Sequence, residues 1–136
     1  MTSSVDPAPL RRRLLAEPAV VSALRRQVVA YAERRCRMDQ NVLADVALCV
    51  SEAVTNVVQH AYRESSGMVD VVARCDHDHL VVEVSDTGSG GAAAAPQPTR
   101  HKHGLGIMRA LADVRITDAA HGGTRIVARF QCDAPA

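Results

Sequence analysis

Apolar residues recur at steps of three and four in two successive stretches of the chain. The first runs from Pro18 to Arg37, and Pro18 suits the first turn of a helix. The second follows Asp39, a residue type that favours the N-cap position, and extends to residues 62–66, before Gly67. Its apolar stripe comprises Leu43, Val46, Ala47, Val50, Val54, Val57 and Ala61. We therefore predict two consecutive helices, each with one buried face.

The segments on either side of these helices have the composition of strands. Residues 68–75 and 79–86 are rich in valine and are separated by the polar turn 76–78, which predicts a β-hairpin. Residues 11–15, an arginine run followed by two leucines, predict a short first strand. Strands therefore precede and follow the two helices along the chain.

The C-terminal part of the chain repeats this alternation on a smaller scale. Residues 104–113 begin with a glycine turn and then follow the helical period. Residues 114–118 and 124–131 predict two strands around the glycine turn 121–123, with Ile126, Ala128 and Phe130 on one side of the last strand. This segment therefore adds one helix and a second hairpin.

The order strand, helix, helix, hairpin, helix, hairpin predicts an α+β fold. We expect a two-layer sandwich, a mixed or antiparallel sheet with helices on one face. The 136 residues fit one domain, which we place at residues 10–132, with a disordered tail at 1–9 and a frayed tail at 133–136. Residues 87–103, rich in glycine, alanine and proline, are long enough for a functional lid.

Composition excludes several classes of function. The formal net charge is +1 and aromatic residues make up 2% of the chain, so neither a basic surface nor exposed aromatic rings favour nucleic-acid binding. We find no apolar run that approaches a membrane span, and we expect no membrane partner. The cysteines are Cys36, Cys49, Cys75 and Cys132, and no two of them form a CxxC pair. We expect reduced, mostly buried thiols in a cytoplasmic protein, although the even count also allows disulfides.

The first candidate cluster lies on the second predicted helix. Glu52, Asn56 and His60 are four residues apart and therefore line one edge of it. A carboxylate and an amide oxygen at this spacing suit Mg²⁺, and the carboxylate could instead act as a general base. Taken alone, the same pattern also describes a polar helix face in contact with water.

Two further clusters combine glycines with a charged residue. Asp86 ends a valine-rich strand and is followed by Gly88 and Gly90, which suits a hydrogen bond to an exocyclic amine and close approach of the backbone to a ligand. An ordinary turn would have the same sequence.

The third cluster is Gly104-Leu105-Gly106, which precedes a helix and could present N–H groups to phosphate oxygens. Lys102, the only lysine, stands next to it and could meet the terminal phosphates, or simply be solvated. The pairs His77 with His79 and His101 with His103 lie on predicted loops without further ligands at suitable spacing, so we do not favour a zinc site.

The order and spacing of the three clusters resemble the GHKL (Bergerat-fold) ATPases. Glu52 and Asn56 match the N box of that family, and Asp86, Gly88 and Gly90 match its first glycine box. Gly104, Leu105 and Gly106 correspond to its second glycine box, and Thr124 to the threonine of its last strand. Within this superfamily the chain is similar to the single-domain anti-sigma-factor serine/threonine kinases, most clearly in the segment SEAVTNVVQHAY at residues 51–62.

The resemblance implies specific roles for these residues. Asn56 would coordinate the Mg²⁺ of Mg-ATP, Glu52 would be the general base, and Asp86 would bind the adenine amine. The glycines of both boxes would shape the lid and the phosphate turn, and Thr124 would act on the adenine side. Lys102 would stand near the γ-phosphate, where the family often has an arginine, a bidentate donor that lysine does not replace.

The resemblance also implies a function and partners. The protein would be an ATP-dependent serine/threonine kinase and anti-sigma factor. It would sequester a sigma factor of RNA polymerase and phosphorylate an anti-anti-sigma protein of the STAS type, as a possible homodimer. Two alternatives stay open: an ATP-dependent binding module with weak or no catalysis, to which Lys102 points, and a detached domain that phosphorylates a histidine on another chain.

Overall fold

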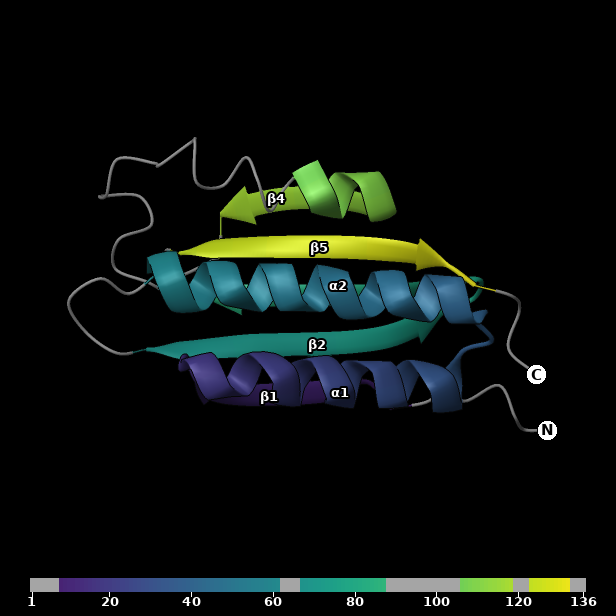
Figure 1. The fold of residues 1–136 in the computed structure, drawn as a ribbon, viewed down its shortest axis with the longest axis horizontal. Helices are drawn as coiled ribbons and strands as arrows, with labels where there is room; N and C mark the ends of the chain where they lie inside the picture. The colour runs from purple at the N-terminus through teal and green to yellow at the C-terminus, as the bar shows by residue number, and fades with distance from the viewer. Residues whose placement is uncertain (1–7, 62–66, 88–105, 119–122, 133–136) are drawn as a thin grey trace.

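The computed structural model describes residues 8–61, 67–87, 106–118 and 123–132. Five antiparallel strands form one sheet in the order β1-β2-β3-β5-β4 (Figure 1). The elements are β1 Leu10–Leu15, α1 Pro18–Arg35, α2 Gln40–Asn56, the π-helix η1 Val57–Ala61, β2 Met68–Asp76, β3 His79–Asp86, β4 Asp113–Asp118 and β5 Thr124–Gln131. A short helical segment, residues 106–111, precedes β4. The predicted α+β class, the first strand and both hairpins are therefore confirmed.

The two long helices lie side by side on one face of the sheet (Figure 1). α1 contacts β1 and β2, whereas α2 contacts β3 and β5, so the helix layer spans most of the sheet. Alternate residues of each strand face this layer, and the expected inward row of Ile126, Ala128 and Phe130 is buried. The core between the layers consists mainly of valine, leucine and alanine, because the chain has so few aromatic residues.

The helix starts follow the local sequence. α1 begins at Pro18, and Asp39 caps α2 by accepting a 2.9 Å hydrogen bond from the backbone N–H of Val42. The end of the second helix differs from the prediction. The α-helical hydrogen-bond pattern stops at Asn56 and changes to the wider π pattern of η1, and residues 62–66 lie outside the described part of the chain. No glycine or proline marks this change, which is why the pattern alone extends the helix.

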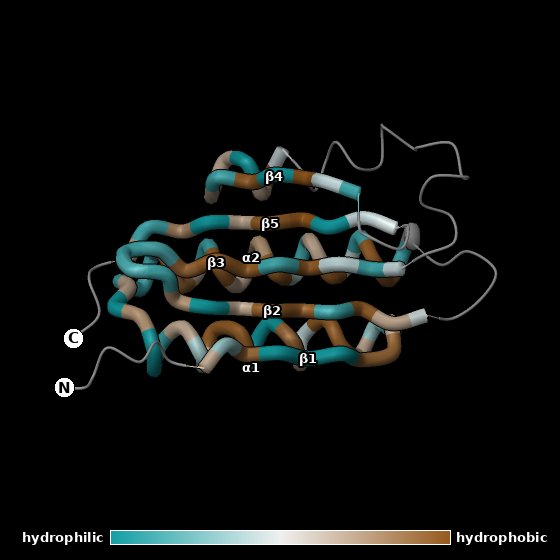
Figure 2. Tube along the Cα trace, turned by 180° about the vertical axis from the view of Figure 1, so that it is seen from behind, coloured by the Kyte–Doolittle hydropathy of each residue, from teal (hydrophilic) through white to brown (hydrophobic). Residues whose placement is uncertain are grey.

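The opposite face of the sheet carries most of the strand charges. Figure 2 looks onto this face, with the helices behind it, and hydrophilic and hydrophobic positions alternate along the strands. Glu83 on β3 accepts a 2.8 Å contact from Arg74 and lies 3.8 Å from Arg125, which links three neighbouring strands. These pairs are partly exposed, so they contribute little to stability and mainly keep this face polar.

The cysteine prediction is wrong for two of the four residues. Cys36 and Cys75 form a disulfide with a Cα–Cα distance of 6.3 Å. Cys36 caps the C-terminus of α1, and Cys75 lies near the end of β2. Their 39-residue separation carries no local signal, since the pairing depends on α1 packing against β2. Cys49 and Cys132 are buried and are not in a disulfide.

One statement about apolar runs also needs correction. The 20-residue stretch Gln40–Gln59, which is α2 with the start of η1, is long and apolar enough by composition alone to cross a membrane. Its apolar residues pack against the sheet and α1, and Val46, Val50 and Val54 are almost completely buried. We therefore interpret it as the central core helix.

Candidate functional site

Three chain segments that the sequence singles out meet at one end of the molecule. β3 ends at Asp86, and the antiparallel β5 begins beside it, with Ser85 opposite Arg125. α2 ends at Asn56 near the same end of the sheet (Figure 1), and η1, which continues from it, contacts β3. The fold thus brings the end of α2, the end of β3 and the start of β5 together.

Asp86 is the one charged side chain that is buried among the described residues, with 6% of its surface exposed. A buried carboxylate is costly unless hydrogen bonds compensate for the lost hydration. Gly123, the residue directly before β5, lies against Asp86, and its φ of +81° lies in the left-handed region that glycine readily adopts. The backbone of β5 therefore approaches the end of β3 very closely, and this approach fixes Asp86 at the strand end.

Asn56 carries a second unusual polar group. Its Nδ2 is buried and has no hydrogen-bond partner among the described residues. A buried amide donor without a partner costs about 1–3 kcal/mol, so such a group calls for an external acceptor. The N–H suits an anionic oxygen such as that of a phosphate, and the oxygen of the same amide is a ligand type that Mg²⁺ prefers.

Glu52 lies one helical turn before Asn56 on α2 and is partly exposed. Ser51, the residue before Glu52, connects α2 to α1. Its hydroxyl donates a hydrogen bond to the Ala47 carbonyl at 2.9 Å and accepts one from Arg25 Nη1 at 3.3 Å. Arg25 on α1 thereby fixes the turn of α2 that carries Glu52. The amide oxygen of Asn56 is a ligand type that Mg²⁺ prefers, and the Glu52 carboxylate one turn away suits either a metal ligand or a general base.

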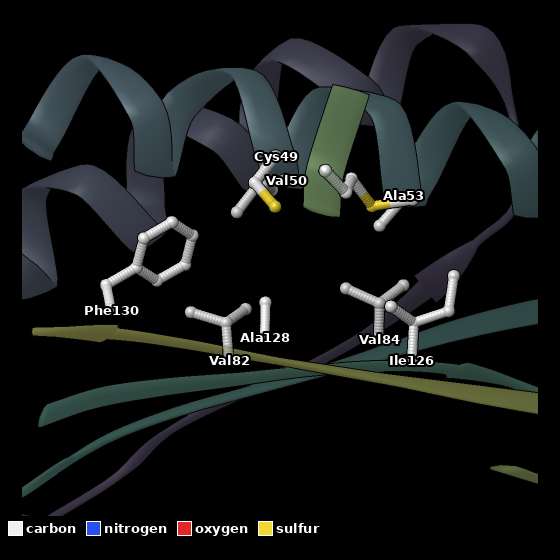
Figure 3. A pocket seen from close by; sticks show the side chains of 9 residues that line it. Cys49, Val50, Ala53, Val82, Val84, Ile126, Ala128 and Phe130 are labelled. Carbon is white, nitrogen blue, oxygen red and sulfur yellow. The ribbon is translucent and has the colours of Figure 1, made fainter. Parts of the chain in front are cut away.

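A small apolar cavity adjoins the polar end of α2 (Figure 3). Cys49, Val50 and Ala53 of α2 face Val82 and Val84 of β3 and three residues of β5 across it, and Met108 is a further lining residue. Its volume is about 10 Å³, which is room for a single water molecule. A planar base therefore does not fit inside this cavity.

Burial raises the pKa of the Cys49 thiol to about 12, and the carboxylates of Asp45 and Glu52 add to the rise. This cysteine stays protonated near neutral pH, so it is a poor nucleophile and belongs to the apolar wall.

The other predicted site residues are only partly described. Thr124 is half-buried at the start of β5, and Gly106 is exposed at the start of the helical segment 106–111. Gly88, Gly90, Lys102, Gly104 and Leu105 lie outside the described residues, as does nearly all of the lid 87–103. His60 belongs to the π-helix, and its side chain is not described. His79 contacts Asp78 at 2.9 Å, and the described residues contain no group of three or more metal-binding side chains.

Three residues contribute to this region without being among the predicted site residues. Gly123 belongs to a predicted turn, and its position directly before Thr124 is the signal that could identify it. Met108 and Arg25 fall within predicted helices, and nothing local shows that one lines a cavity and the other reaches α2.

The fold is that of the histidine kinase-like ATPase domain. The chain matches that family over residues 14–130 and belongs to it. It is 35% identical to the serine-protein kinase RsbW of Bacillus mycoides over 66 residues, which are 48% of this chain and 41% of that protein. It is 32% identical to the anti-sigma F factor of Clostridium acetobutylicum in an alignment of 94 residues that covers 61% of this chain and 66% of that protein.

A solved structure extends the likeness to the whole fold. The crystal structure of the RsbU and RsbW domains of Rv1364c from Mycobacterium tuberculosis superposes with a TM-score of 0.70 and 25% identity. The match covers 96% of this chain and 34% of that one. The chain thus spans about two fifths of the length of the RsbW relatives and about one third of this structure.

Proposed function

We propose that the protein is an ATP-dependent serine/threonine kinase that acts as an anti-sigma factor. It sequesters a sigma factor of RNA polymerase in the cytoplasm and phosphorylates a STAS-type anti-anti-sigma protein. The observation that supports this most is that the buried Asp86 and the Asn56 amide, which has no partner among the described residues, lie at the same end of the fold. The RsbW and anti-sigma F relatives point to the same activity and partners.

The site residues that the structure describes each have a role in this proposal. The Asp86 carboxylate accepts a hydrogen bond from the exocyclic amine of adenine. Asn56 donates its free N–H to a phosphate oxygen and offers its amide oxygen to Mg²⁺. When bound, Mg²⁺ would neutralise phosphate charge. Thr124 lies beside Asp86 on the adenine side.

Glu52 is the general base of the proposed transfer. It takes the proton from the acceptor serine hydroxyl while the serine oxygen forms its bond to the γ-phosphorus and the bond to the bridging oxygen of ADP breaks. Phosphoryl transfer depends mainly on positioning and charge neutralisation, which is the task of Asn56, the glycine boxes and Lys102. Arg25 holds the helical turn of Glu52 through Ser51.

Incubation with labelled ATP and a candidate STAS-type protein tests the proposal. We expect acid-stable, base-labile label on the acceptor, and its loss in Glu52→Ala with nucleotide affinity retained. Glu33→Ala, which removes an exposed glutamate of α1, is the matched control and should transfer label normally. Nucleotide binding without any transfer by the wild-type protein would refute the kinase and favour an ATP-dependent binding module. Acid-labile, base-stable label would instead indicate a phosphohistidine.

A further inference from the structure

The disulfide joins the two layers of the fold. Cys36 ends α1 and precedes the start of α2 by four positions, so it belongs to the helix layer. Cys75 lies in β2, within the sheet layer. Among the described residues this is the one covalent link between the layers apart from the backbone connections.

The ring closed by this bond contains the helix of the proposed nucleotide site. The chain from Cys36 to Cys75 includes all of α2, with Glu52 and Asn56, and returns to the sheet through β2. The disulfide lies at the N-terminal end of α2, whereas Asn56 lies at its C-terminal end. Any effect of the bond on the site is therefore exerted through the placement of α2 on the sheet.

The contact between α2 and the sheet is imperfect where it faces the strands of the site. The small residues Cys49 and Ala53 line the cavity between them, and a cavity deprives its walls of packing contacts. The disulfide adds a covalent attachment between the helix layer and the sheet to this packing.

Exposure distinguishes the bonded pair from Cys49 but not from Cys132. Cys36 and Cys75 are buried but keep 7% and 8% of their surface accessible, and Cys132 keeps 8%. Cys49 is 2% exposed, and burial raises its pKa to about 12, so its thiolate does not compete in exchange.

We propose that Cys36 and Cys75 are a reversible redox pair that sets the affinity of the nucleotide site. A thiolate of a dithiol reductant attacks one sulfur, the disulfide bond breaks, and a mixed disulfide forms. The second thiol of the reductant then attacks this mixed disulfide and releases the protein thiol. The two sulfurs of the reductant end joined in a disulfide. The protein pair gains two electrons and two protons, and α2 is no longer linked covalently to β2. The reduced protein binds nucleotide more weakly, because α2, which carries Glu52 and Asn56, is held less firmly on the sheet, which carries Asp86.

Linkage makes the coupling reciprocal. If reduction weakens nucleotide binding by a given factor, bound nucleotide must oppose reduction by the same factor. We expect a factor of roughly five to ten, at the lower end of the usual range of allosteric coupling. The part of the proposal that concerns nucleotide rests on the proposed function, whereas the redox pair itself does not.

The first experiment measures the pair without nucleotide. Alkylation under denaturing conditions, followed by intact-mass analysis, should find two reactive thiols in the oxidised protein and four after equilibration with dithiothreitol. Reduction should lower Tm by roughly 10 °C, since the cross-link restricts the unfolded chain. Four thiols in protein purified under air, or a bond that dithiothreitol does not open in the folded state, would overturn the proposal.

The second experiment compares ADP affinity, by calorimetry, in the oxidised and reduced states of the same wild-type protein. Cys36→Ser/Cys75→Ser should behave like the reduced protein, and Cys132→Ser, which is equally buried but outside the bond, should still respond to reductant. Equal ADP affinity in both states would overturn the coupling. If ADP binds in neither state, the proposed function fails, and the thiol counts and Tm shift still decide whether the pair is reversible.

Discussion

A methyl group placed on Gly123 would lie 2.1 Å from the backbone oxygen of Asp86 and 2.6 Å from its Oδ1. The positive φ of Gly123 adds strain for any other residue. We therefore expect Gly123→Ala to displace the buried carboxylate and to lower the free energy of unfolding by about 1–3 kcal/mol. Urea unfolding and calorimetry with ADP measure the two effects, and both stability and affinity should fall.

Gly106 provides the contrast for this experiment, because a methyl group there meets no atom within 4 Å. Gly106→Ala should not destabilise the fold, since alanine is the better helix former by about 1 kcal/mol. Equal unfolding energies for Gly123→Ala and the wild type would show that the strand end tolerates the contact, and Gly123 would have no positioning role.

Asp86→Asn tests the adenine contact separately from the fold. The side chain keeps its shape but loses its charge, so an amine that donates to it loses a hydrogen bond worth about 1.5–3 kcal/mol. We expect ADP affinity to fall roughly tenfold or more. Inosine diphosphate, which lacks the exocyclic amine, should bind wild type and variant with similar affinity, and a strong loss for both nucleotides would contradict the assignment.

Met108 should matter far more for stability than its neighbour in the chain. It is fully buried against the cavity, whereas Ile107 is 39% exposed. Met108→Ala removes a side chain that lines the cavity and should lower the free energy of unfolding by about 2–5 kcal/mol. Ile107→Ala should change it by no more than about 0.5 kcal/mol. The comparison uses urea unfolding with the disulfide oxidised in both variants. Similar losses would show that residues 106–111 are not attached through Met108.

The sequence predicts those parts of the fold that local patterns determine. The helical period identifies α1 and α2, Asp39 identifies the start of α2, and valine-rich runs identify β2 and β3. The end of α2 is harder, because the change from α to π hydrogen bonding at Val57 occurs without a local stop signal.

The features that escape prediction depend on contacts between distant segments. The Cys36–Cys75 bond requires that α1 and β2 pack together, and the approach of Gly123 to Asp86 requires that β3 pairs with β5 and not with β4. The family resemblance names Asp86 and Asn56, but only the fold shows that the Asp86 side chain and the Asn56 Nδ2 are buried and that this Nδ2 has no partner within the described part of the chain. Residue types can thus be found by pattern, whereas their protonation and packing follow from the tertiary structure.

The thiol of Cys49 should lower the free energy of unfolding at alkaline pH. In the unfolded chain it ionises at its ordinary pKa of 9.0, but burial, with Asp45 and Glu52 adding to it, raises the pKa to about 12 in the folded state. The stabilisation from this group is complete below pH 9 and is lost as the pH rises from 9 toward 12, because only the unfolded state releases the proton. The free energy of unfolding should then fall by about 1.4 kcal/mol per pH unit from this group alone.

Cys49→Ala should remove this slope while the other alkaline titrations continue. The measurement is urea unfolding between pH 8 and 10.5 with the Cys36–Cys75 bond oxidised, and Cys132→Ala serves as the matched control with the wild-type slope. Cys49→Ala loses some packing, so its curve starts lower and should converge with the wild-type curve as the pH rises. Parallel curves would mean that the thiol ionises at the same pH in both states, which its position between α2 and the sheet does not permit unless the cavity around it opens to water.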